Sequence, residues 1–87
     1  MHALIWRVTI KEPVEANRIL HQEIVPAISQ TPGFAGGYWA ETEDGHGTAM
    51  VLFDSEADAR RVADMPEPQT DAFDIEVSEL AEVVAQA

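Results

Sequence analysis

The sequence contains no cysteine and only five basic residues among 87. The lack of cysteine excludes disulfide bridges, thiolate metal sites and cysteine nucleophiles. The five basic residues stand against sixteen Asp and Glu, which gives a formal net charge of −11. Such an acidic chain is a poor partner for nucleic acid or for an anionic membrane surface. We therefore expect neither as a partner and interpret the acidic residues as a solvated surface.

Long apolar runs are also missing, because no stretch approaches the roughly 18 apolar residues of a membrane-spanning helix. The N-terminal residues 1–7 lack the basic and apolar regions of a signal peptide. On these grounds we expect a cytoplasmic protein. A chain of this length forms one domain and buries only about 60–65% of its unfolded surface, so that a partner would add much to its stability.

Six segments, each with the character of either a strand or a helix, follow one another along the chain. Strand formers and turn signals predict strands at residues 2–10, 34–43, 48–54 and 73–84. Apolar spacing of three and four residues predicts helices at residues 14–30 and 55–65. Pro26 predicts a kink near residues 22–23 of the first helix, because proline cannot donate the helical hydrogen bond. Ser55 and Asp58 predict a capping box at the start of the second helix.

The order β-α-β-β-α-β predicts an α+β, ferredoxin-like domain over residues 1–87, with a four-stranded antiparallel sheet and two helices on one face. Thr31 precedes a proline and is expected to end the first helix, and Gly33 supplies the chain reversal. Gly36 and Gly37 in the second strand predict a bulge or the close approach of a neighbour. A further bulge is expected at residues 78–79, because Phe73, Ile75 and Val77 share one face but the later apolar residues change parity.

Residues 44–47, Asp-Gly-His-Gly, have the composition of a hairpin loop. A loop of even length would place Trp39 with Met50 and Leu52 on one face of the sheet, and Tyr38 with Val51 and Phe53 on the other. Both faces are then rich in large apolar side chains, although a solvated face should be polar.

We therefore expect the face opposite the helices to form a homodimer interface. Its expected members are Ile5, Arg7, Trp39, Glu41, Met50 and Leu52. Arg7 is a lone cation on this face and would need a carboxylate when buried. Glu41 is its expected partner, in an ion pair that crosses the two-fold axis. The alternative is an arginine that binds an anion at the mouth of the dimer.

Three segments of the chain, 32–39, 51–57 and 75–80, together with the order of elements, resemble the antibiotic biosynthesis monooxygenase-like family of the dimeric α+β barrel superfamily. The resemblance covers nearly the whole chain. It implies a homodimer in which two sheets form a barrel, and a pocket between sheet and helices in each subunit. Activities in the family include cofactor-free oxidation of polycyclic phenols, quinol oxidation and haem degradation.

The residues argue against the haem-degrading branch of this family. Members of that branch carry an asparagine on the first strand and a tryptophan at the end of the third, and the corresponding positions here hold Trp6 and Phe53. They also use a histidine on the second helix, and residues 55–65 contain none. No cofactor is therefore expected, and no pair of histidines has the spacing of a metal site.

The pocket implied by the resemblance would be lined by Trp6, Tyr38 and Phe53, which offer flat apolar walls to an aromatic ligand. Trp6 and Phe53 can equally be ordinary core residues. Tyr38 and His21 are the candidate catalytic groups, as a proton donor and a general base. His21 can equally be a boundary residue without a role.

Two functions thus remain open. The first is a cofactor-free monooxygenase that acts on a planar aromatic or polyketide-type substrate. The alternative is a non-catalytic dimeric module that binds a ligand or has a structural role. An open apolar pocket would favour an enzyme or a ligand carrier, and a filled core would favour the structural module.

Overall fold

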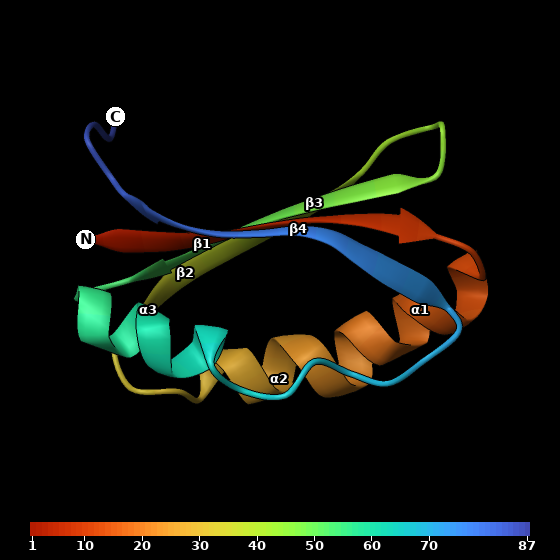
Figure 1. Ribbon diagram of the computed structural model, residues 1–87, viewed down its shortest axis with the longest axis horizontal. Coiled ribbons are helices and arrows are strands. Elements are labelled where there is room, and N and C mark those ends of the chain that lie inside the picture. Colours follow the sequence, from red (N-terminus) through yellow and green to blue (C-terminus); the bar gives the residue numbers. More distant parts are fainter.

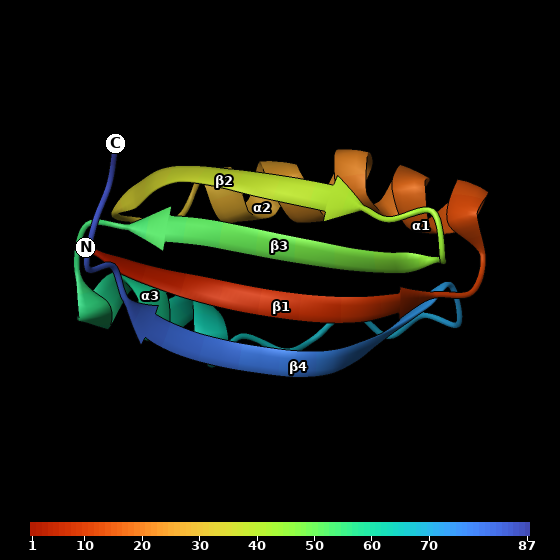
Figure 2. The same cartoon turned by 90° about the horizontal axis from the view of Figure 1, so that it is seen from above.

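The computed structural model describes residues 1–87 as one sheet covered on a single face by helices (Figure 1). In chain order the elements are β1 (His2–Ile10), α1 (Pro13–Ile19), η1 (Leu20–Ile24), α2 (Val25–Ser29), β2 (Phe34–Glu41), β3 (His46–Phe53), α3 (Glu56–Ala63) and β4 (Phe73–Glu82). All strand pairs are antiparallel and the strand order is β2-β3-β1-β4, as Figure 2 shows from above. The predicted α+β, ferredoxin-like arrangement is confirmed. None of the helices is both long and apolar enough to cross a bilayer.

The first helical region runs from Pro13 to Ser29 and changes type in its middle. Its central turn, η1, is a π-helix, in which the N–H of Val25 donates to the carbonyl of Leu20. Pro26 follows at once and has no N–H to donate to Gln22, so that the regular α-helical bond is unavailable at this point. The predicted distortion near residues 22–23 is therefore present, in the form of a widened turn.

The second helix starts where the capping residues predict. The Ser55 hydroxyl accepts a hydrogen bond from the N–H of Asp58 and caps the N-terminus of α3. In the loop between α2 and β2, Gly33 adopts a left-handed conformation with φ of +78°, and a side chain there would collide with Asp58 of α3. The expected chain reversal at Gly33 is confirmed.

The hairpin between β2 and β3 differs from the prediction in both position and length. Tyr38 lies opposite Met50, and Trp39 lies opposite Ala49. The backbone of Thr42 pairs with His46, which leaves a turn of three residues, Glu43–Gly45. Gly45 completes this turn with a φ of +84°, as is typical of three-residue hairpins.

An odd number of turn residues reverses the predicted faces of β2, because side chains alternate along a strand. Trp39 shares the helix-covered face with Ala49 and Val51, and Tyr38 lies on the open face beside Met50. Tyr38 is accordingly 75% exposed. The expectation that Trp39 belongs to the open face and Tyr38 to the helix-covered face is therefore wrong.

The sheet contains two register shifts, one in each of its edge strands, β2 and β4. The pairing of β2 with β3 shifts at Ala35, next to Gly36, as the glycine pair predicts. The pairing of β1 with β4 shifts so that Glu76 is the extra residue, rather than residues 78–79. Because of this bulge, Val77 pairs with Arg7 on the open face and does not share the face of Ile75.

The packed core lies at the end of the sheet that α3 and α2 cover. It consists of Leu4, Ile28, Val51, Phe53, Ala59 and Val62. Phe53 is completely buried and meets Phe34 edge to face, with ring centroids 6.4 Å apart. This end of the molecule is filled by side chains, and the opposite end is not.

Candidate functional site

A cavity of about 740 Å³ opens between the sheet and the first helical region. The floor comes from the middle of the sheet and from the end of the sheet beside α1, and most of η1 forms one wall. Met65, Pro66, Glu67 and Pro68, which follow α3, form the edge on the other side. The volume is within the range of small-molecule binding sites.

The size of the side chains along β3 explains why the cavity lies at this end. On the helix-covered face, β3 presents Phe53 and Val51 at one end, then Ala49 and Gly47 at the other. The large pair fills the space beneath α2 and α3, whereas the small pair leaves a low floor beneath α1 and η1. The sequence signal for this cavity is the pair of small residues Gly47 and Ala49, two positions apart in β3. It can be interpreted only once it is known which face of β3 the helices cover.

Both tryptophans of the chain line the cavity on either side of Ala49. The register places Trp39 on β2, Ala49 on β3 and Trp6 on β1 at one level of the sheet. Two strand spacings separate the tryptophan backbones by about 10 Å. The Trp6 indole N–H donates to the Ser78 hydroxyl at 3.1 Å, which satisfies its polar group and turns it toward β4.

Trp39 takes its position because Gly37 has no side chain. A Cβ atom at residue 37 would lie 2.9 Å from two atoms of the Trp39 ring, far inside normal contact distance. The close neighbour predicted for the glycine pair is therefore the indole of the same strand. Trp39 therefore lies over Gly37 and Trp6 is turned toward Ser78, with Ala49 on the strand between them.

The predicted pocket residues are only partly brought together. Trp6 lines the cavity, but Phe53 is in the packed core and Tyr38 is on the other face of the sheet. The placement of Phe53 and Tyr38 on the pocket wall is wrong. Tyr38 therefore cannot act on a ligand in this cavity within one chain. Trp39, which was expected on the opposite face of the sheet, forms an aromatic wall of the cavity.

The polar groups of the cavity lie around its mouth, where they are exposed. They include Asn17 on α1, His21 and Glu23 on η1, and Glu41 at the end of β2. His21 is the predicted general base that does reach the cavity. No group of three or more His, Asp or Glu side chains is placed to hold a metal ion.

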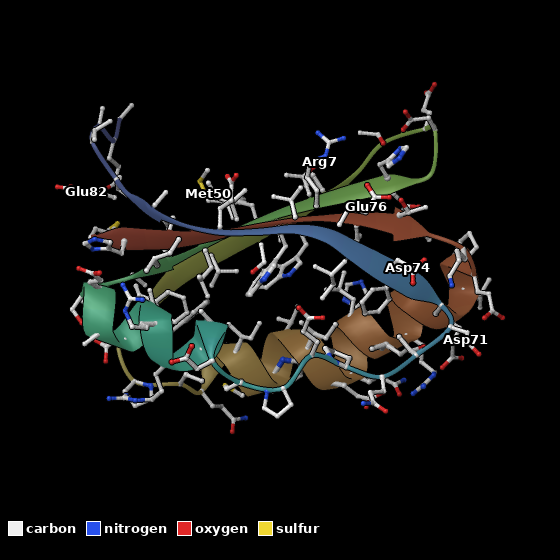
Figure 3. The ribbon with its side chains drawn as sticks, viewed as in Figure 1. Arg7, Met50, Asp71, Asp74, Glu76 and Glu82 are labelled. Atoms are coloured by element: carbon white, nitrogen blue, oxygen red, sulfur yellow. The ribbon has the colours of Figure 1, made fainter.

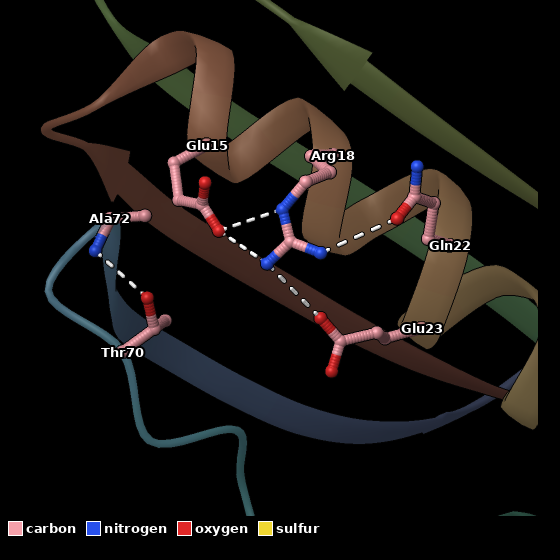
Figure 4. A network of polar contacts seen from close by, with 6 residues as sticks. All are labelled: Glu15, Arg18, Gln22, Glu23, Thr70 and Ala72. Carbon is pink, nitrogen blue, oxygen red and sulfur yellow. Dashed lines mark hydrogen bonds and ion pairs between the residues drawn. The ribbon is translucent and has the colours of Figure 1, made fainter.

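Arg18 ties α1 to the π-helical turn at the edge of the cavity (Figure 4). Its guanidinium donates to the Glu15 carboxylate, through Nε at 2.8 Å and also through Nη2, and to the Gln22 side chain. Glu23 lies 3.5 Å from the same guanidinium. The hydrogen bond from Arg18 lowers the pKa of Glu15, and the same contact raises the pKa of Arg18.

The open face carries four of the six predicted interface residues. Ile5, Met50 and Leu52 lie there on adjacent strands, together with Arg7. Figure 3 shows Arg7 and Met50 directed away from the helices. Trp39 and Glu41 belong to the other face, so Glu41 does not share the face of Arg7 as the predicted ion pair between them assumed. Arg7 has no ion-pair partner within the chain.

The chain matches no model of a known protein family and no curated protein. Its resemblance to the monooxygenase-like family therefore stays a prediction.

Replacing Arg18 with methionine should raise the pKa of Glu15 toward its ordinary value. The pKa of Glu15 is lower in the folded than in the unfolded chain, so the pair stabilises the fold above the ordinary glutamic pKa. This contribution is lost as the pH falls through the lowered folded value. An NMR titration of the glutamate carboxyl carbons in Arg18→Met measures the shift. Glu56 is the internal control, because Arg60 lowers its pKa independently, and an unchanged Glu15 would contradict the assignment.

Proposed function

We propose that this chain binds a planar aromatic molecule in the cavity and oxidises it with molecular oxygen, without a cofactor. The observation that carries the proposal is the open apolar cavity with both tryptophans on its walls. A filled space between sheet and helices would instead have favoured a purely structural module. Flat rings pack well between indole walls, since aromatic pairs are stable in both offset-stacked and edge-to-face arrangements.

His21 is the proposed general base, because it is the histidine on the cavity wall and its imidazole can accept a proton from a ligand at the mouth. A substrate with an acidic CH2 group between aromatic rings and a carbonyl would lose a proton to His21 and form a carbanion. The imidazolium then pairs with this anion. No lysine or arginine lines the cavity to do so in its place. Asn17, near the same mouth, is the available amide donor.

The oxidation balances with oxygen alone. The carbanion transfers one electron to O2, and the two radicals combine to a peroxide anion. This anion takes back the proton from His21, and the hydroperoxide loses water to leave a carbonyl group. One CH2 group and one O2 thus become one C=O group and one water, and the substrate supplies all the electrons.

A ligand carrier without turnover is the second candidate. The polar groups at the mouth favour it, because they are exposed and none is a buried base held in place by a second side chain. In that case the cavity would bind the same class of molecule, and oxygen would not be consumed. The cytoplasmic location expected from the sequence applies to both candidates.

We also propose that two chains associate through the open face to form a dimeric α+β barrel. Several facts support it: Met50 is 44% exposed and Tyr38 is 75% exposed on a face that also carries Ile5 and Leu52. Apolar groups of this kind gathered on one sheet face are typical of an interface. Arg7 would then find its carboxylate on the second chain, among acidic residues of the open face such as Glu79.

Filling the cavity should weaken binding while the fold remains. Ala16 on α1 lines the cavity, and Ala16→Leu should weaken binding of a tricyclic aromatic probe such as anthrone by at least about tenfold. The two indole N–H signals in an NMR titration report occupancy, because both tryptophans line the cavity. Ala57→Leu, an exposed change on α3, is the control and should bind normally. Equal binding by both variants would place the ligand elsewhere.

Oxygen uptake with a panel of anthrones and quinols separates the enzyme from the carrier. We expect the wild-type chain to consume oxygen with at least one compound, and His21→Gln to lose about 10²-fold or more of that rate while the compound still binds. His46→Gln, in the β2–β3 hairpin region and outside the cavity, should retain the rate. Binding without any uptake across the panel would favour the carrier.

Light scattering should give a mass of two chains, each of 9.5 kDa. Met50→Glu should shift this to one chain, because a carboxylate would have to be buried without a partner in the middle of the interface. Val14→Glu is the matched control, at a position on α1 that is 88% exposed. A wild-type monomer at micromolar concentration would refute the dimer.

A further inference from the structure

The cavity has an uneven distribution of charge that the proposed function does not use. Three carboxylates, those of Glu23, Glu41 and Glu67, line it, and no lysine or arginine does. None of the five basic residues of the chain lines it. Arg7 is on the open face, and the others pair with acidic residues: Lys11 with Asp74, Arg18 with Glu15 and Glu23, Arg60 with Glu56, and Arg61 with Asp58.

Glu23 is partly neutralised, because Arg18 lies 3.5 Å from its carboxylate. Glu41 and Glu67 have no ion pair, and neither side chain takes part in a hydrogen bond within the chain. The charge at the mouth is therefore negative and uncompensated. The net charge of −11 extends the same sign over the whole molecule.

Glu41 is the carboxylate closest in register to an aromatic wall. It follows Trp39 by two residues on the same face of β2, which is a separation of about 7 Å along the strand. Its neighbour across the strand pair is Gly47, which has no side chain to shield it. The Trp39 ring itself leans the other way, over Gly37, so the two groups form an aromatic wall and a separate free carboxylate at the mouth. A free carboxylate at the mouth of an apolar cavity favours a ligand with an organic ammonium group, through an ion pair.

From this arrangement we infer that the cavity selects planar aromatic ligands that carry a protonated amine, with the ring between the tryptophans and the amine beside Glu41. Ligands with a carboxylate or phosphate are disfavoured, because the cavity wall has no lysine or arginine to compensate their charge. The inference rests on the proposed cavity function and specifies the chemical class of its ligand.

Three compounds with one ring system and different charge test the selection: 1-naphthylmethylamine, 1-naphthalenemethanol and 1-naphthoic acid. Their affinities follow from NMR titration of the two indole N–H signals. The amine should bind most tightly and the carboxylate most weakly, with at least about a tenfold difference between these two. The difference in affinity between the amine and the carboxylate should shrink in about 0.5 M NaCl. At that salt concentration the Debye length falls well below its value of about 10 Å at 0.1 M, so the charges are screened.

Glu41→Gln should reduce the ratio of amine to carboxylate affinity at least about threefold. Glu43→Gln makes the same change of net charge in the hairpin turn, outside the cavity, and should leave the ratio within about twofold. An equal effect of both substitutions would overturn the role of Glu41, since the long-range field alone would then explain the preference.

The outcomes separate this inference from the function on which it rests. If the alcohol binds and the three affinities are equal, or the carboxylate binds best, the charge selection is overturned and the cavity function stands. If none of the three compounds shifts either indole signal, the cavity function and the charge selection are both overturned.

Discussion

The three-residue turn between β2 and β3 determines the face on which every side chain of β2 lies. One residue more or fewer would exchange the two faces, because the side-chain period of a strand is two. With three residues, Trp39 and Glu41 point toward the helices and Tyr38 points away from them. The aromatic wall of the cavity and the acidic group at its mouth therefore depend on a turn that does not itself line the cavity.

Stability and cavity are divided between the two ends of one sheet. At the α3 end, Phe53 and Val51 are fully buried and form the core with residues from α2 and α3. At the other end the strand β3 contributes only Gly47 and Ala49, and the helical layer there contains the π-helical turn. A small chain can keep an open cavity in this way, because the packed end supplies the stabilising burial that the hollow end lacks.

Much of the fold was predictable from the sequence, because its signals are local. The Ser55 cap, the reversal at Gly33 and the distortion before Pro26 each follow from the chemistry of one or two residues. The order of the elements then determines the sheet. The candidate site was harder to predict, because it depends on the parity of a turn whose composition, Glu-Asp-Gly-His-Gly, fits more than one loop length.

The packing of Trp39 against Gly37 makes residue 37 a determinant of where one wall of the cavity stands. A Cβ there would lie 2.9 Å from the indole, so any side chain would force the ring to move. Related chains with alanine or serine at this position would therefore hold this wall differently on the same backbone. The shape of the space open to a ligand thus depends on a glycine that does not itself line the cavity.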